Sequence, residues 1–268
     1  MAVSNKLRLF HRIIEVRALY EAAAFTVLKP LLHDSRHGDG HGVMVIPGFM
    51  ANDVLTAQLR GSLNLMGYTA VGWGNGANFG MRKDVFEKTM KEVRRLNAET
   101  GGPITLIGWS LGGFYARALA NSEPDLIRQV ITLGSPFNVS LVATDAIESK
   151  NVRRLYKLLN PADHDELSHY SALVNKTPPV PFTSVFTCSD GIADWQMCVD
   201  KSESDRCQNI RIRASHAGMT HNALVLYLLH KLLPQQRDNW KPLRLGKVAR
   251  NLLQMTSFTK RAIAPSMA

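Results

Sequence analysis

A serine flanked by glycines, set between an apolar run and a run of small residues, constrains this chain more than any other feature. The stretch reads Gly108-Trp109-Ser110-Leu111-Gly112-Gly113. It follows the apolar run Ile104–Ile107 and precedes the small-residue run Phe114–Ala120. This order predicts a strand, a sharp turn with the serine at its apex, and a helix.

The residue types of this turn suit a reactive serine. Ser110 would stand on a strained turn, with its Oγ exposed above a sheet. A side chain at Gly108 or Gly112 would crowd the neighbouring strand and the start of the helix, which favours glycine at both positions. The N–H of Leu111 would lie at a helix N-terminus, where developing negative charge is stabilised. We therefore predict that Ser110 is a nucleophile, the alternative being an ordinary glycine turn.

Strands and helices alternate along most of the chain. Amphipathic stretches such as Lys83–Glu99 and Asn222–Leu233 indicate helices. Strands that alternate with helices form a parallel sheet covered on both faces, with ligand sites at the carboxyl ends of the strands. We predict an α/β fold with a mostly parallel six-stranded sheet, whose strands are Val43–Ile46, Tyr68–Val71, Ile104–Ile107, Arg128–Leu133, Phe182–Thr187 and Ile210–Arg213.

Two further residues follow predicted strands at the same edge as Ser110. Such a serine needs a base that takes its proton and an acid that orients the base. Asp190 comes directly after the fifth predicted strand, and Asp194 is a second candidate for the acid. His216 follows the last strand and is the candidate base. His221 lies at the start of the next helix, where we expect a capping or packing role.

The combined pattern resembles the α/β-hydrolase superfamily, in a lipase- or esterase-like bacterial branch. The resemblance covers about residues 38 to 233. It implies a minimal version of the fold, the chain order serine, acid, histidine, and Asp190 as the acid. It rests on the serine turn together with Gly38-Asp39-Gly40-His41, Pro47-Gly48-Phe49, Trp73-Gly74-x-Gly76-x-Asn78-x-Gly80, Asp190-Gly191-Ile192-x-Asp194-Trp195 and Ser215-His216.

The resemblance also implies an oxyanion hole and a reaction. The backbone N–H groups of Phe49 and Leu111 would bind the oxyanion, although Pro47 stands where small bacterial lipases carry histidine. The expected reaction is hydrolysis of a small-molecule or lipid ester through an acyl-enzyme. Two alternatives are acyl transfer to an acceptor other than water and a non-catalytic binding role. Apolar residues expected at the same edge, and therefore candidates to line a substrate pocket, are Met50, Trp73, Phe79, Trp109 and Phe137.

The chain divides into three expected parts. Residues 1–36 form an amphipathic helix, residues 37–235 the hydrolase domain, and residues 236–268 a basic tail. An insertion at about 138–181 carries helical pieces and no clear strand, which predicts a short helical cap. Two interpretations of the first helix remain open: it packs on the domain, or its basic, amphipathic character gives peripheral contact with a membrane.

Composition and motifs exclude several other functions. The net charge is +10, but the chain has no RNA-binding motif, zinc-finger spacing or interleaved basic and aromatic stripe, so we expect no nucleic-acid partner. The glycine-rich stretch Gly72–Gly80 fits neither the dinucleotide nor the P-loop spacing. The histidines His33, His37 and His41 lack a metal-protease motif. We therefore predict no cofactor and no metal.

Targeting signals and cysteines indicate a reducing compartment. Charged residues interrupt the N-terminal apolar pattern, and no run is long enough to cross a membrane, so we expect a cytoplasmic protein without a signal peptide. Three cysteines are too few for a disulfide framework. Cys188 is predicted to be a buried small hydrophobe. Whether Cys198 and Cys207 form a disulfide is left open.

Overall fold

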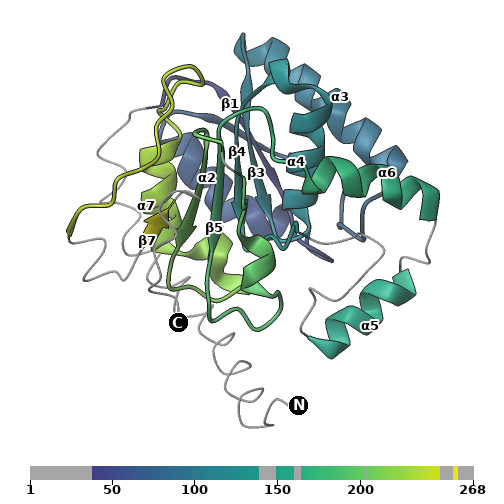
Figure 1. The fold of residues 1–268 in the computed structure, drawn as a ribbon. Helices are drawn as coiled ribbons and strands as arrows, with labels where there is room; N and C mark the ends of the chain where they lie inside the picture. Colours follow the sequence, from purple (N-terminus) through teal and green to yellow (C-terminus); the bar gives the residue numbers. More distant parts are fainter. Residues whose placement is uncertain (1–37, 139–148, 160–163, 203, 248–255, 259–268) are drawn as a thin grey trace.

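The structure, a computed structural model, describes residues 38–138, 149–159, 164–202, 204–247 and 256–258 (Figure 1). The predicted N-terminal helix at residues 1–36 lies outside the described residues. So do parts of the predicted cap and most of the predicted basic tail after residue 247.

Six parallel strands form the body of the sheet, which confirms the predicted α/β fold. The strand order is β2-β1-β3-β4-β5-β6-β7. The seventh strand, β7 (Thr256–Phe258), pairs antiparallel with β6 and was not predicted, since three residues carry no periodic pattern. The six parallel strands are β1 (Gly42–Ile46), β2 (Thr69–Gly72), β3 (Ile104–Trp109), β4 (Ile127–Leu133), β5 (Phe182–Phe186) and β6 (Cys207–Arg211).

The bounds of β6 differ from the prediction, which placed this strand at 210–213. The strand begins earlier than predicted, at Cys207. The prediction began too late because Gln208 and Asn209 are polar, although their side chains are buried. Gln208 Nε2 donates to Thr183 Oγ1 at 3.0 Å, and Asn209 Nδ2 donates to the Asp200 carbonyl at 2.9 Å. Buried amides with such partners are stable, but they hide the strand from a hydrophobicity pattern.

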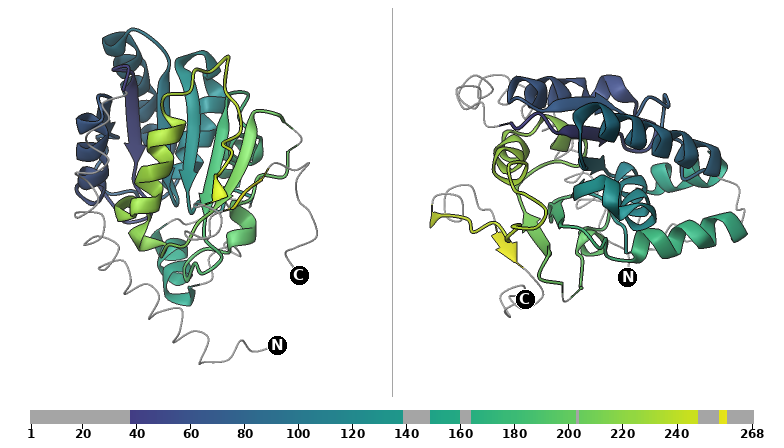
Figure 2. Two further views of the ribbon diagram at one scale, coloured as in Figure 1. Left: turned by 90° about the vertical axis from the view of Figure 1, so that its left-hand side faces the viewer. Right: turned by 90° about the horizontal axis from the view of Figure 1, so that it is seen from above.

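Helices cover both faces of the sheet (Figures 1 and 2). On one face lie α2 (Asp53–Leu65) and α7 (Ala223–Leu232); on the other lie α3 (Lys83–Thr100), α4 (Gly112–Ser122) and α6 (His164–Asn175). The side chains of strand β1 alternate between the two faces of the sheet. Val43 and Val45 pack in the core on the side of α2 and α7, and Met44 and Ile46 pack in the core on the side of α3, α4 and α6. A strand buried on both faces must be apolar throughout. Short 3-10 helices are η1 (Pro124–Leu126), η2 (Trp195–Cys198) and η3 (Ala217–His221).

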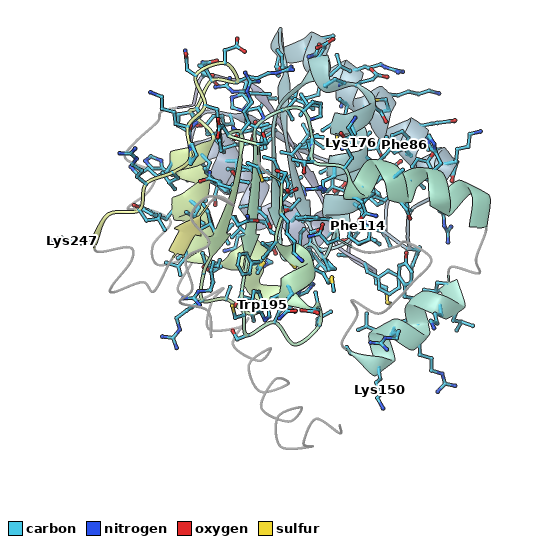
Figure 3. All side chains as sticks on the ribbon, in the orientation of Figure 1. Phe86, Phe114, Lys150, Lys176, Trp195 and Lys247 are labelled. Atoms are coloured by element: carbon cyan, nitrogen blue, oxygen red, sulfur yellow. The ribbon has the colours of Figure 1, made fainter. Side chains whose placement is uncertain are left out.

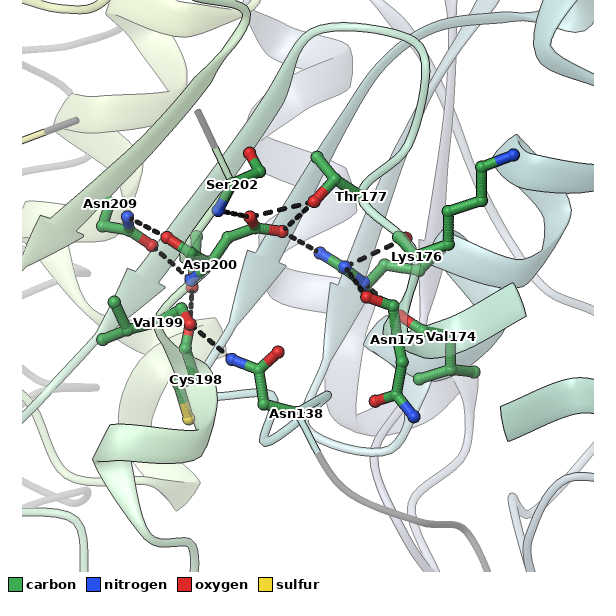
Figure 4. A network of polar contacts seen from close by, with 12 residues as sticks. Asn138, Val174, Asn175, Lys176, Thr177, Cys198, Val199, Asp200, Ser202 and Asn209 are labelled. Atoms are coloured by element: carbon green, nitrogen blue, oxygen red, sulfur yellow. Dashed lines mark hydrogen bonds and ion pairs between the residues drawn. The ribbon is translucent and has the colours of Figure 1, made fainter. Parts of the chain in front are cut away.

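The segment between β4 and β5 carries α5 (Lys150–Leu159) and α6, and its described residues contain no strand. A buried arginine of α4, Arg117, fixes the end of α6, whose residues Val174 and Asn175 are labelled in Figure 4 beside Asp200. Its guanidinium donates to the carbonyls of Val174 at 2.5 Å, Asn175 at 3.2 Å and Lys176 at 3.0 Å, and it pairs with Asp200 at 2.9 Å. The last carbonyls of a helix need such donors. The end of α6 is therefore tied directly to the helix that follows Ser110.

The cysteines correct one prediction and answer an open question. Cys188 is exposed and not buried, since β5 ends at Phe186 and Cys188 lies in the loop beyond it. Cys198 and Cys207 are buried and free, without a disulfide between them. Within the described part of the chain, no helix is both long enough and apolar enough to cross a membrane.

Candidate active site

Ser110 stands at the turn between β3 and α4 with its backbone in the left-handed region, at φ 52°. Its N–H donates to the Leu133 carbonyl at 2.8 Å. Its carbonyl accepts from Ser135 Oγ at 2.6 Å and from the Gly113 N–H at 3.0 Å. A non-glycine residue pays about 1–3 kcal/mol for such a conformation, and it persists only where the surroundings fix it. Here three hydrogen bonds do so.

The two glycines around Ser110 lie where a side chain would not fit, as the sequence predicts. A Cβ on Gly108 would come within 2.4 Å of Gly113 Cα. A Cβ on Gly112 would come within 2.2 Å of the Ile46 carbonyl oxygen. The close approach of β3, α4 and the end of β1 therefore requires both glycines.

The structure brings Ser110, His216 and Asp190 together in one chain of contacts. His216 Nε2 lies 2.9 Å from Ser110 Oγ, and His216 Nδ1 lies 2.6 Å from Asp190 Oδ2. The other carboxylate oxygen of Asp190 accepts from the N–H groups of Ile192 and Ala193, each at 2.8 Å. Those two bonds leave Oδ2 directed at the imidazole. Ser110 is thus joined at the carboxyl edge of the sheet to His216, which lies 106 positions away in sequence.

Neither Asp194, the second candidate for the acid, nor His221 takes part in these contacts. The Asp194 carboxylate accepts from the Gln196 N–H at 2.9 Å, which caps η2. His221 closes η3 and pairs through Nδ1 with Thr220 Oγ1 at 2.8 Å. Both side chains have a local structural role, as expected for His221.

Burial and neighbouring groups hold the histidine in place. His216 is 3% exposed and Asp190 is 5% exposed. Trp109 Nε1 donates to the His216 carbonyl at 3.0 Å, so this tryptophan supports the histidine backbone. A Cβ on Gly134 would lie 3.3 Å from His216 Nδ1, so the absence of a side chain there leaves room for the ring.

The loop after β1 lies against the serine turn. A Cβ on Gly48 would come within 3.1 Å of Ser110 Cβ, so the backbone of this loop approaches the nucleophile closely. Among the described residues, the N–H groups of Phe49 and Leu111 have no hydrogen-bond acceptor. The next residue, Met50, is in the left-handed region at φ 60°.

A fully buried asparagine, Asn78, holds this loop; the sequence placed it in the glycine-rich motif but gave it no role. Asn78 Nδ2 donates to the Pro47 carbonyl at 2.8 Å. Its backbone accepts from the Met50 N–H at 2.7 Å and donates to the Ala51 carbonyl at 2.9 Å. The only available signal was an amide residue inside the glycine-rich stretch Gly72–Gly80. A buried asparagine in such a loop indicates a specific partner.

The candidate lining residues fall into two groups. Met50 is 50% exposed and Phe79 is 38% exposed. Trp73 and Phe137 are instead packed in the core: Trp73 lies edge-on to Tyr115 at 5.5 Å between ring centroids, and Phe137 lies beneath Arg117. Trp109, the fifth candidate, is the support of His216 described above. A large apolar residue after a strand does not reveal by itself whether it faces a pocket or the core.

The histidines considered for metal binding have other partners or lie outside the described residues. His41 Nδ1 contacts Asp39 Oδ1 at 2.5 Å, and His41 Nε2 contacts Thr105 Oγ1 at 2.9 Å. His33 and His37 precede the described residues. Across the described ranges, no group of three or more metal-binding side chains lies together.

Comparison with known proteins concerns the fold and the family. The sequence model of a family described as "alpha/beta hydrolase fold" matches residues 46–178. The serine hydrolase BPHL of Mus musculus is 30% identical over 115 residues, which are 39% of this chain and 39% of that protein. The biotin biosynthesis bifunctional protein BioHC of Teredinibacter turnerae is 40% identical over 73 residues, or 27% of this chain and 12% of that protein. The matches thus span well under half of either relative.

A solved structure supports the fold over a longer stretch. Lipase B of Aspergillus fumigatus superposes with a TM-score of 0.57 at 13% identity, over 76% of this chain and 54% of that one. At this identity the likeness concerns the fold alone. It extends beyond the residues that the family model matches.

Proposed function

We propose that this chain, which has the α/β-hydrolase fold and matches the family model of that fold over residues 46–178, hydrolyses carboxylic esters through Ser110, His216 and Asp190. One observation carries the proposal: the unbroken contact chain from Ser110 Oγ through the imidazole to the Asp190 carboxylate. A serine hydroxyl is a weak nucleophile unless a base within hydrogen-bond reach takes its proton. In this site the base is within 2.9 Å and is oriented by the acid.

The first step is attack of Ser110 Oγ on the acyl carbon. As the new C–O bond forms, His216 Nε2 takes the hydroxyl proton. The Asp190 carboxylate accepts a hydrogen bond from His216 Nδ1–H, which leaves Nε2 unprotonated and ready to act as the base. The same carboxylate then stabilises the imidazolium. Its own two backbone donors keep it from rotating away.

The negative charge that develops on the substrate oxygen would be bound by the N–H groups of Phe49 and Leu111. Donors fixed by the fold stabilise this charge without rearranging during the reaction. Asn78 supports the Phe49 side of this pair, and the start of α4 presents the Leu111 side. Removal of one such donor reduces the rate about 10²- to 10³-fold in serine hydrolases.

The reaction is completed by three proton transfers. The imidazolium gives its proton to the leaving alcohol, whose C–O bond breaks, and an acyl-enzyme remains on Ser110. Water then attacks the acyl carbon while His216 takes a proton from it, and Ser110 Oγ leaves with that proton. Exposed Met50 lies in the loop after β1 (residues 47–50, here called the oxyanion loop), and exposed Phe79 lies in the loop paired with it, which favours an apolar acyl chain over a charged one.

The proposal is tested by assaying nitrophenyl esters of graded acyl chain length with the full chain. Ser110→Ala should abolish turnover, whereas Ser122→Ala, a change of the exposed last serine of α4, should leave it unchanged. Turnover that survives in Ser110→Ala would refute the proposal. A second arm adds alcohols as acyl acceptors: if transfer outruns hydrolysis, the same triad serves an acyltransferase.

A further inference from the structure

Cap helix α5 has two chemically different faces. Three cationic side chains and one leucine are exposed on it: Lys150, Arg154, Lys157 and Leu158, the leucine being 75% exposed. Their spacing of four, three and one residues places them on one side of an α-helix. Tyr156 is buried on the opposite side. The helix contains four basic residues and no acidic one.

The buried face of α5 lies against the oxyanion loop. The Tyr156 ring packs on Phe49 with 5.2 Å between centroids, and Arg82 donates to the Leu159 carbonyl at 3.5 Å. Figures 1 and 2 show α5 at the end of the molecule toward which the parallel strands point. In Figure 3 the Lys150 side chain extends away from the rest of the protein. The basic face therefore looks outward, next to the candidate active site.

Exposed apolar side chains lie close to this basic face. Met50 and Phe79 belong to the oxyanion loop and to the loop paired with it, on which α5 rests, and Leu158 projects from α5 itself. Cationic side chains interspersed with exposed apolar ones match an anionic bilayer, where the cations meet headgroups and the apolar groups enter the interface. An acidic protein surface would match the charges, but it would leave the apolar side chains without partners.

We propose that the outward face of α5 docks on anionic phospholipid membranes and brings the active-site opening to the bilayer. This inference rests on the proposed function, since it makes esters dissolved in a lipid phase the substrate class of the same site. Docking itself does not require turnover, so the two can be tested apart.

The test measures partitioning of the full chain, as Ser110→Ala, onto vesicles of phosphatidylcholine with and without 30% phosphatidylglycerol. We expect binding only to the anionic vesicles. Each basic residue near such a surface contributes about fivefold, so Lys150→Gln, Arg154→Gln and Lys157→Gln combined should reduce partitioning about 100-fold. The matched control replaces the exposed Lys91, Lys201 and Lys241 by glutamine, with the same change in net charge and little change in partitioning.

Four outcomes separate the interpretations. Docking is supported if vesicle partitioning falls in the α5 triple variant and not in the control triple variant, and if Leu158→Ser also lowers partitioning. Equal loss in both triple variants would show a diffuse charge effect and overturn the proposal, as would absence of binding by the parent. Binding to polyglutamate but not to vesicles would identify an acidic protein partner instead. Thermal melting of each variant establishes that it is folded, and Ser110-dependent turnover is measured separately, so failure of one claim does not imply failure of the other.

Discussion

The buried side-chain amide of Asn78 donates a hydrogen bond of 2.8 Å to the carbonyl oxygen of Pro47, so the loop after β2 holds the loop after β1. Within the described chain, Met50 and Ser110 are the non-glycine residues with positive φ. One stands in the loop that Asn78 holds and the other is the candidate nucleophile. The two strained positions thus lie in the two segments that would supply the oxyanion donors. Backbone strain of this kind is typical of sites where the fold holds functional groups in position.

Asn78→Ala should lower kcat about 100-fold and leave KM nearly unchanged, because a displaced Phe49 donor matters chiefly in the transition state. Asn75→Ala is the control: Asn75 lies in the same loop but binds Trp73 and Thr89, away from the oxyanion loop. Steady-state kinetics on a nitrophenyl ester gives kcat and KM of both variants, and a thermal melt of each variant shows whether it is folded. An unchanged kcat in a folded Asn78→Ala would exclude a positioning role.

Asp190→Asn should reduce kcat about 10⁴-fold, because the amide cannot stabilise the imidazolium and favours the wrong tautomer. Asp194→Asn should change kcat little, since that carboxylate only caps η2. Comparing kcat of the two variants on one soluble ester tests the assignment. If only the Asp194 change collapsed the rate, the acid would be misassigned.

Arg117→Leu should lower the free energy of unfolding by about 3–5 kcal/mol, because it leaves the Asp200 carboxylate buried without its counter-ion. Urea unfolding measures this loss. Arg117→Leu with Asp200→Leu should cost less than the two single changes added, since the double variant leaves no charge unpaired. Additive losses would show that the pair is not coupled.

Stability should fall as the pH decreases, through two residues at the amino end of the sheet. Burial alone would raise the pKa of Asp39, but hydrogen bonds from His41 and Arg128 outweigh it and lower the pKa to about 2. Burial lowers the pKa of His41, with Asp39 offsetting part of that effect. In both cases the unfolded chain takes up the proton first as the pH falls.

The two residues act in different pH ranges. The His41 contribution is complete above about pH 6.5 and is lost as the pH falls below it; the Asp39 contribution is lost between about pH 4 and 2. In urea unfolding at pH 7.5 and 5.5, His41→Gln should therefore lose less stability between the two pH values than the parent does. His221, whose pKa is also lowered by burial, accounts for part of the remaining slope. An identical pH dependence in both proteins would contradict the interpretation of His41.

Much of this site could be predicted from sequence because each catalytic candidate follows a strand. Ser110, Asp190 and His216 come after apolar runs that only a buried parallel sheet explains, and the structure places all three at one edge. What pattern analysis missed were the roles of buried polar residues, such as the hydrogen bond from Asn78 to the Pro47 carbonyl and that from Asn209 to the Asp200 carbonyl. It also could not separate Trp73 in the core from Met50 at the surface, since both are apolar and follow strands.

The most direct test of the central claim is covalent labelling with a fluorophosphonate, followed by mass spectrometry of the digested protein. The account predicts one adduct, on the peptide containing Ser110, and a marked loss of labelling in Asp190→Asn, with labelling of Asp194→Asn and Ser122→Ala preserved. No adduct on folded protein, or an adduct on another residue that persists in Ser110→Ala, would contradict the assignment of Ser110 as the nucleophile.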